Sequence, residues 1–116
     1  MEAIVPQDVQ YRHITWWKMP AIRNALEKYE IVLFLDSDAL IYDQTFSIHD
    51  LMVRWGMHDN ISLCASTDYW VNWHINTGVM MFRRSDTAFE ILDTLITCPE
   101  DPNSGCARYR DVPYHE

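Results

Sequence analysis

Basic residues are scarce in this chain, which has nine Lys and Arg against seventeen Asp and Glu and a formal net charge of −8. An excess of negative charge disfavours nucleic acid or an anionic membrane surface as the main partner. An acidic protein still binds a nucleotide where a divalent cation neutralises the phosphates. We therefore expect no nucleic-acid partner, while nucleotides stay open.

Glycine and proline are also few, with three and five residues, so the sequence has no low-complexity linker, and it shows no internal repeat. No apolar run approaches the ~20 residues that span a bilayer, and the N-terminus lacks the pattern of a secretory signal. Hydrophobic residues make up 48% and charged residues 22%, as in ordinary globular proteins. These totals predict one domain with a modest core and no membrane span.

The three cysteines leave alternatives open. Cys64 sits in an apolar run, where it is expected to pack as a small hydrophobe. Cys98 and Cys106 bracket a polar loop, and they either form a short disulfide in an oxidising compartment or remain two thiols. A zinc site is not expected, because no Cys-x-x-Cys pair exists.

Apolar periodicity and capping residues predict alternating helices and strands. The predicted helices cover residues 16–29 after an N-cap at Thr15, 48–55 after Ser47 with Asp50 in a capping box, and 85–97 opened by Ser85 and Asp86. The predicted strands are Ile31–Leu35, Ile61–Ala65 and Val79–Phe82, and an irregular loop follows Cys98 and Pro99.

The run Ile31–Leu35 has no polar alternation, which predicts a strand buried on both faces, as in a mostly parallel sheet covered by helices. Alternating helices and strands indicate an α/β fold. The fold looks incomplete, because only three strands are predicted and the sequence ends in a loop.

Asp36, Ser37 and Asp38 follow that strand directly. Ligands of open α/β sheets bind outside the carboxyl ends of strands, and side chains two residues apart on an extended segment point to the same side. Two carboxylates suit Mg²⁺ or Mn²⁺, which take one or two carboxylates together with substrate phosphates. The cation would neutralise a diphosphate leaving group and act as a Lewis acid.

Asp-x-Asp also has other interpretations. It is compatible with a plain surface turn, since Asp and Ser are common turn residues. A phosphatase-like hydrolase with Asp36 as nucleophile would use the same pattern, but Gly-Thr normally follows in that class, whereas Ala39 and Leu40 follow here. The residues that flank the motif favour a third interpretation.

Four segments carry a resemblance to one family: Trp16-Trp-Lys18, Pro20-Ala-Ile-Arg23, Phe34-Leu-Asp-Ser-Asp-Ala-Leu-Ile41 and Asn76-Thr-Gly-Val-Met-Met-Phe-Arg83. Together they resemble the Golgi galactosyl-, mannosyl- and xylosyltransferases of fungi and plants, with the related nucleotide-diphospho-sugar transferases as a second match. The resemblance covers roughly residues 12–97. It implies the GT-A fold, a Rossmann-related mixed sheet flanked by helices, which would be incomplete at both ends.

By this resemblance, Asp36 and Asp38 would hold Mn²⁺ (or Mg²⁺) and the diphosphate of a nucleotide sugar, for which UDP is favoured over GDP. Asp38 would be the more direct metal ligand, with Ser37 between the two carboxylates in the donor site. Lys18 falls at the family's helix lysine near the donor, where its ammonium would act as a point charge on phosphate or sugar oxygens.

Trp16 and Arg23 lie in the same motifs and are candidate donor-binding residues. For Lys18 and Arg23, a solvated position on the helix face remains an alternative.

Asn76, Thr77 and Gly78 match the family's start of a strand that lines the sugar site. Gly78 would permit close backbone approach, and Asn76 offers both a donor and an acceptor to sugar hydroxyls. A simple turn before a strand is the alternative. Trp70 and Trp73 would either stack on sugar rings or be buried in the core. His74 receives no role.

Three departures from the family limit this expectation. The region that grips the base should be longer than the 35 residues before Asp36, and no late metal-binding His is found. The family's acidic pair before Gln is matched only by the final residues His115 and Glu116, which makes Glu116 a candidate catalytic residue. We therefore expect residues 1–116 to form a partial catalytic domain from a fragment, a truncated product or a pseudoenzyme.

The predicted reaction is metal-dependent transfer of a hexose or pentose from the nucleotide sugar to a hydroxyl of a glycan or glycoprotein, with retention of anomeric configuration. The resemblance places the full-length form in the Golgi lumen as a type II membrane protein. The alternative is a non-catalytic module that binds sugar or protein.

Overall fold

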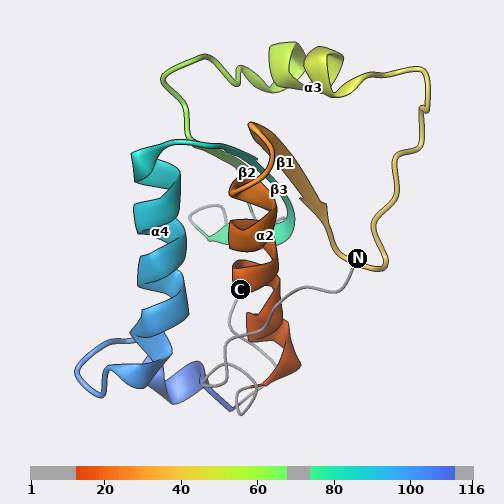
Figure 1. The fold of residues 1–116 in the computed structure, drawn as a ribbon. Helices are drawn as coiled ribbons and strands as arrows, with labels where there is room; N and C mark the ends of the chain where they lie inside the picture. Colours follow the sequence, from red (N-terminus) through yellow and green to blue (C-terminus); the bar gives the residue numbers. More distant parts are fainter. Residues whose placement is uncertain (1–12, 68–73, 112–116) are drawn as a thin grey trace.

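The computed structural model describes residues 13–67 and 74–111, which form a small α/β domain (Figure 1). The helices are α2 (Lys18–Leu26), α3 (Ile48–Trp55) and α4 (Asp86–Thr97), and the strands are β1 (Ile31–Leu35), β2 (Leu63–Thr67) and β3 (Ile75–Arg83). Short 3₁₀ helices are η1 (Ile14–Trp17), η2 (Cys98–Glu100) and η3 (Ala107–Tyr109). No helix in the described ranges is long and apolar enough to cross a membrane.

The capped helices lie where the sequence predicts them. At α3, the Ser47 hydroxyl accepts the Asp50 N–H and the Asp50 carboxylate accepts the Ser47 N–H, so the capping box is confirmed. Gly56 ends α3 with a φ of 68°, a left-handed conformation that suits glycine. Ser85 caps α4 by accepting the Ala88 N–H.

The first helix differs from its prediction. A 3₁₀ turn precedes α2, the ring of His13 rather than Thr15 accepts the first N–H, and α2 ends at Leu26. Pro20 explains the tighter start, because a residue without N–H cannot bond to the carbonyl of Trp16 four residues earlier.

The sheet has the order β1-β3-β2, and both strand pairs are antiparallel. The mostly parallel sheet is therefore a wrong prediction for the strands that the structure describes. Burial of β1 on both faces is also wrong, because all five of its residues are only partly buried and the strand lies at an edge of this sheet. A continuous apolar run indicates burial, but it carries no information about strand direction.

β3 is longer than predicted, and its pairing with β2 contains an irregularity. Its ladder with β2 passes from Ala65 opposite Met80 directly to Ser66 opposite Asn76. Residues 77–79 therefore bulge away from β2, while the Asp36 N–H donates to the Gly78 carbonyl at 2.8 Å. Bulges of this kind re-aim side chains and are frequent beside active sites.

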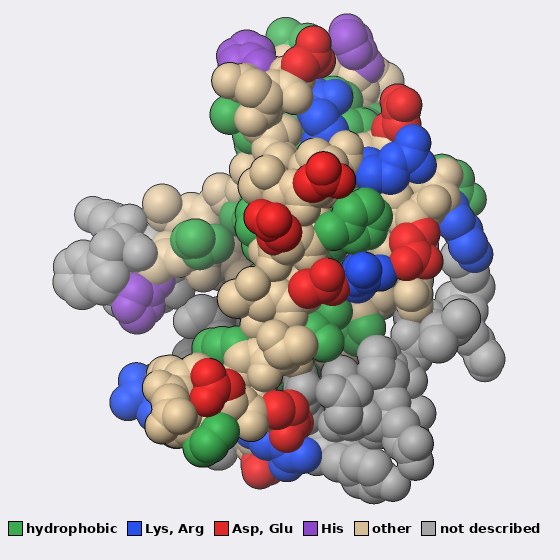
Figure 2. Space-filling view, turned by 60° about the vertical axis from the view of Figure 1, so that its left-hand side comes forward, with side chains coloured by type: hydrophobic (Ala, Val, Ile, Leu, Met, Phe, Trp, Pro, Cys, Tyr) green, Lys and Arg blue, Asp and Glu red, His purple; other side chains and the backbone are tan. Residues whose placement is uncertain are grey.

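The core lies between the sheet and the helices α2 and α4, which run side by side on one face (Figure 1). Its most deeply buried members come from α2, β3 and α4: Ile22, Leu26, Met80, Phe82, Ala88 and Leu92. On the face shown in Figure 2, acidic and basic side chains lie next to one another, and no continuous basic patch is formed. Cys98 and Cys106 form a disulfide, which decides between the two alternatives left by the sequence.

Candidate active site

The hairpin of α2 and β1 brings the start of the helix over the end of the strand. Nine helical residues at ~1.5 Å per residue and five strand residues at ~3.3 Å cover similar lengths, so Lys18 and Asp36 lie at the same end. Figure 1 shows the two elements running in opposite directions. Because α2 and β1 are adjacent in the chain and of similar length, the proximity of Lys18 and Asp36 can be predicted from the sequence.

Lys18 is held in place by three neighbours. Its ammonium donates to the Thr77 hydroxyl at 2.8 Å, lies 3.7 Å from the Asp36 carboxylate and sits 5.6 Å from the centre of the Phe34 ring. Only 11% of its side chain is exposed. Lys18 is therefore not a solvated helix-face residue. Its charge faces the end of β1.

Residues Asp36 to Ala39 form a turn, closed by the Ala39 N–H donating to the Asp36 carbonyl at 2.9 Å. The extended segment assumed from the sequence is therefore wrong, because the chain bends directly after β1. Asp36 and Asp38 nevertheless line the same cavity. Asp36 is partly buried beside Lys18, whereas Asp38 is exposed.

The cavity has a volume of about 400 Å³, within the range of small-molecule sites. Its lining combines predicted residues with unpredicted ones: Ile14, Thr15, Lys18, Phe34, Asp36, Ser37 and Asp38. Phe34 could have been inferred from the sequence, since it lies two residues before Asp36 and side chains two apart on a strand point to the same side. Nothing in the sequence signals Ile14, and Thr15 was expected only as a helix cap.

Gly78 of β3 lies against the Asp36 carboxylate, and the Asn76 side chain folds back onto Gly78. The Asn76 side-chain oxygen accepts the Gly78 N–H at 2.9 Å. A Cβ at Gly78 would lie 3.0 Å from that oxygen and 3.1 Å from Asp36 Oδ2. The close approach expected at Gly78 is thus made by the carboxylate of this chain, and Thr77 reaches Lys18 from the same bulge.

Arg23 and Trp16 lie elsewhere. Arg23 donates to Asp93 at 2.6 Å and to Glu27 at 2.7 Å, and the hydrogen bond that Asp93 accepts raises the pKa of the guanidinium. It therefore ties α2 to α4 and does not line the 400 Å³ cavity. Trp16 is 7% exposed, and its indole N–H donates to the Tyr109 carbonyl at 3.1 Å.

Three predicted residues, Trp70, Trp73 and Glu116, lie outside the described residues. Within 13–67 and 74–111, no three His, Cys, Asp or Glu side chains are grouped as a metal cluster. Among the described residues that line the cavity, Asp36 and Asp38 supply the two carboxylates, and Ser37 and Thr15 add hydroxyl oxygens.

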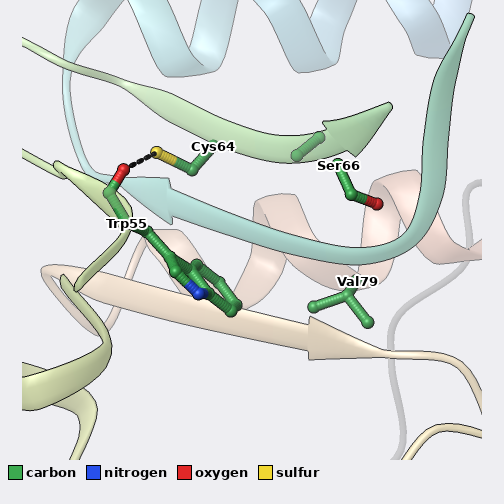
Figure 3. A pocket seen from close by; sticks show the side chains of 5 residues that line it. Trp55, Cys64, Ser66 and Val79 are labelled. Carbon is green, nitrogen blue, oxygen red and sulfur yellow. Dashed lines mark hydrogen bonds between the residues drawn. The ribbon is translucent and has the colours of Figure 1, made fainter. Parts of the chain in front are cut away.

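A second cavity lies on the opposite face of the sheet, between α3 and β2 (Figure 3). Its volume is about 470 Å³, and it is lined by Trp55, Cys64, Ala65, Ser66 and Val79. The Cys64 thiol faces the Trp55 carbonyl at 3.9 Å. No charged side chain is among these lining residues, so we place the candidate active site at the first cavity.

The fold and the first cavity define an α/β domain in which a partly buried lysine and two carboxylates line one site, a set suited to a metal-bound phosphate. Residues 3–72 match the model of the galactosyl transferase GMA12/MNN10 family, and the chain belongs to this family. The match contains the Lys18 and Asp36–Asp38 motifs and ends before Asn76. No curated protein and no solved structure gave a significant match.

Family membership confirms the resemblance stated from the sequence. It makes the chain a member of a nucleotide-sugar-dependent transferase family, for which a sugar donor and a glycan acceptor are implied.

Proposed function

We propose that the 400 Å³ cavity binds the diphosphate of a nucleotide sugar together with Mn²⁺ or Mg²⁺, and that the domain serves metal-dependent glycosyl transfer. The observation that carries the proposal is the position of Lys18, whose side chain is only 11% exposed and whose ammonium faces a cavity bordered by Asp36 and Asp38. Burying a lysine costs free energy unless its charge is compensated. Thr77 and Asp36 compensate it here and fix it beside the proposed phosphate position.

The two carboxylates have different surroundings, which suggests different roles. Asp36 is constrained between Lys18 and Gly78, so it would orient the site and contribute at most one oxygen to a metal. Asp38 is exposed and would be the more direct ligand. The remaining ligands would come from the diphosphate and water, as is usual for Mg²⁺ and Mn²⁺. A bound cation would stabilise the leaving diphosphate.

Further parts of the proposal rest on the family and on the resemblance. These are a UDP-linked donor, a glycan or glycoprotein acceptor, retention at the anomeric carbon, a GT-A sheet in the whole enzyme and residence in the Golgi. Proton NMR of the product with UDP-galactose, UDP-xylose and GDP-mannose would identify the donor and the anomer formed.

Calorimetry tests the site directly. UDP should bind measurably in the presence of Mn²⁺, and omission of the metal should weaken UDP binding. Asp38→Asn keeps the shape but removes the charge, and it should weaken binding by at least about tenfold, since even loss of a group that supports a ligand costs 10- to 100-fold.

Asp59→Asn is the matched control, because it removes the same charge from a fully exposed side chain outside the cavity. Equal UDP binding with and without metal, or equal binding by Asp38→Asn and the unmodified protein, would exclude the metal site. Such a result would favour the non-catalytic module.

A further inference from the structure

The segment 98–111, here named the clasp, returns from the end of α4 to the start of α2 (Figure 1). It meets the turn η1 through two backbone carbonyls. The His13 N–H donates to the Arg110 carbonyl at 3.0 Å, and the Trp16 indole N–H donates to the Tyr109 carbonyl at 3.1 Å. Since both acceptors are main-chain atoms, the position of η1 depends on the path of the clasp rather than on a particular side chain.

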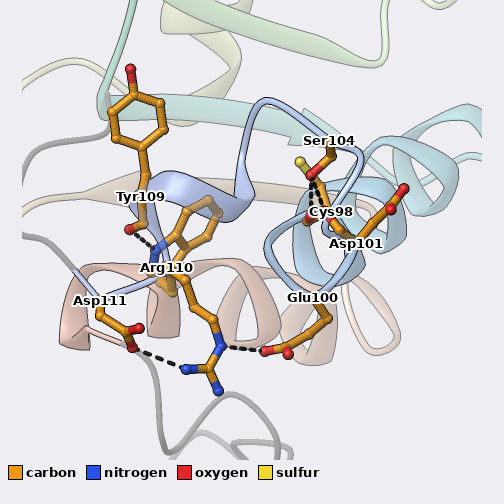
Figure 4. Close-up of polar contacts among 8 residues, drawn as sticks. Cys98, Glu100, Asp101, Ser104, Tyr109, Arg110 and Asp111 are labelled. Atoms are coloured by element: carbon orange, nitrogen blue, oxygen red, sulfur yellow. Dashed lines mark hydrogen bonds and ion pairs between the residues drawn. The ribbon is translucent and has the colours of Figure 1, made fainter.

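Covalent and polar contacts within the clasp fix that path. The Cys98–Cys106 disulfide holds the two Cα atoms 5.6 Å apart, and the Ser104 hydroxyl donates to the Cys98 carbonyl. Figure 4 shows Arg110 reaching back to Glu100, with Nε donating to its carboxylate at 2.8 Å. The disulfide and this ion pair therefore connect both ends of the clasp.

The turn held by the clasp carries one wall of the candidate active site. Thr15 lies in η1, Lys18 follows η1 as the first residue of α2, and both line the 400 Å³ cavity. Trp16, between them, is buried and bonded to the clasp. A shift of Trp16 would therefore move the lysine that faces Asp36.

We propose that the Cys98–Cys106 disulfide and the Arg110–Glu100 pair are positioning elements that hold η1 and Lys18 in the geometry of the donor site. Reduction of the disulfide loosens η1 and weakens binding at the cavity. The effect on binding rests on the function proposed above, whereas the effect on η1 does not. In the reduction, a dithiol gives two electrons and two protons to the cystine, so that two cysteine thiols form and the dithiol becomes a disulfide.

A disulfide that only stabilised the loop between Cys98 and Cys106 would give a different result. A cross-link that acts only on the unfolded chain changes the free energy of unfolding, but it leaves the folded site unchanged. The decisive measurements are therefore made on folded protein, well below its melting temperature.

Hydrogen exchange of the backbone amides provides the first readout. In Cys98→Ser/Cys106→Ser, or in the protein reduced with dithiothreitol, the amides of residues 14–18 should exchange at least about tenfold faster, with the centre of α4 unchanged. Calorimetry with UDP and Mn²⁺ provides the second readout, in which the same variant should bind about three- to tenfold more weakly. Cys64→Ser is the control for the free thiol and should respond to dithiothreitol like the unmodified protein.

Substitution of Arg110 tests the ion pair without touching the disulfide. Arg110→Ala should speed exchange at residues 14–18, and Arg110→Lys should restore part of the protection, because it keeps the charge opposite Glu100 while the backbone carbonyl remains. Arg110→Met, which has a neutral side chain of similar length, should give no such rescue, whereas it would restore protection if the residue only filled space.

The outcomes separate the two proposals. Unchanged exchange at residues 14–18 after loss of the disulfide overturns the clasp, whatever UDP does. Binding of UDP that is strong and equal in the oxidised and reduced protein overturns the link to the donor site, while the proposed function stands. Faster exchange at η1 without UDP binding in either form supports the clasp and rejects the proposed function.

Discussion

Gly78 is a residue of β3 whose backbone lies against the Asp36 carboxylate. The contact exists because the bulge at residues 77–79 leaves the ladder with β2 and continues along β1. A side chain at this position would occupy the space that Asp36 Oδ2 and Asn76 Oδ1 now use. The absence of a Cβ therefore positions a carboxylate, and the conformational freedom of glycine is not needed here.

We expect Gly78→Ala to reduce Mn²⁺-dependent UDP affinity on the order of tenfold, while the free energy of unfolding falls by only about 1 kcal/mol. The new methyl group would stand 3.0–3.1 Å from two side-chain oxygens, which can give way by rotating and so displace the carboxylate. Calorimetry and urea unfolding measure the two effects separately.

Gly105→Ala is the matched control, because a Cβ there meets nothing within 4 Å. It should leave both UDP affinity and stability unchanged. If Gly78→Ala bound UDP as well as Gly105→Ala, the position of Asp36 would not limit the site.

At the scale of elements, the helix α3 has strong local signals and little tertiary support. Ser47 and Asp50 cap each other at its start and Gly56 ends it, yet none of its residues is fully buried. Short helices are marginal on their own, and most helical stability comes from packing. The capping groups should therefore decide how much of α3 is formed.

The pKa of Asp50 predicts how α3 responds to acid. The Ser47 backbone N–H, followed by the Ser47 hydroxyl, lowers the pKa of the Asp50 carboxyl below its usual value. A carboxyl with a lowered pKa in the folded state stabilises that state above its unfolded pKa, and this contribution disappears as the pH falls through the folded value. We expect the amides of α3 to lose protection below pH ~4, ahead of those of α4.

NMR-detected exchange during a pH titration would measure this order, with Asp50→Asn as the comparison. That variant cannot titrate, so α3 should be weakened throughout and should show no added loss on acidification. A decline of α3 and α4 at one common pH would mean that the cap does not control the helix.

The same contrast between local and distant interactions explains what the sequence could predict. Ser47 and Ser85 signal the starts of α3 and α4 because a cap bonds to residues two or three positions away. Lys18 and Asp36 were recognised because they sit in motifs, one at the start of α2 and the other just after β1, and the short hairpin between them brings the two together. The direction of the strands and the bulge at residues 77–79 depend on partners far along the chain, for which a single sequence carries no local signal.

Arg23, which was expected to bind the donor, shows why the residues of the site cannot all be predicted from the sequence. Periodicity places Arg23 on α2, but it does not state which face of the helix a neighbouring helix will cover. The structure places α4 there, and Asp93 takes the guanidinium. A resemblance can therefore indicate which residues deserve attention, while packing decides which of them reach the cavity.

At the scale of the whole molecule, the two faces of the sheet are covered unequally. α2 and α4 pack against one face and form the core with it, whereas α3 stands apart from them (Figure 1). On α3, the large apolar side chains of Val53 and Trp55 are exposed. Two cavities lie on the α3 side. Cohesion should therefore come mainly from the layer between α2, α4 and the sheet.

Leu92→Ala tests this distribution. Leu92 is fully buried in that layer, so its truncation leaves a cavity and should lower the free energy of unfolding by about 2–5 kcal/mol. Val53→Ala, at a side chain that is 70% exposed on α3, should change it by less than about 0.5 kcal/mol. Urea unfolding followed by far-ultraviolet circular dichroism gives both values.

Single domains are stable by only about 5–15 kcal/mol, so the loss at Leu92 would consume much of the total and shift the unfolding midpoint visibly. A comparable loss at Val53 would mean that the apolar side of α3 packs against the sheet in solution and that cohesion is shared by both faces. If the α2–α4 face contributes more stability than the α3 face, the site should not depend on α3. Lys18 and Asp36 lie at the end of the well-packed α2–β1 layer, so a variant that unfolds α3 alone should retain Mn²⁺-dependent UDP binding.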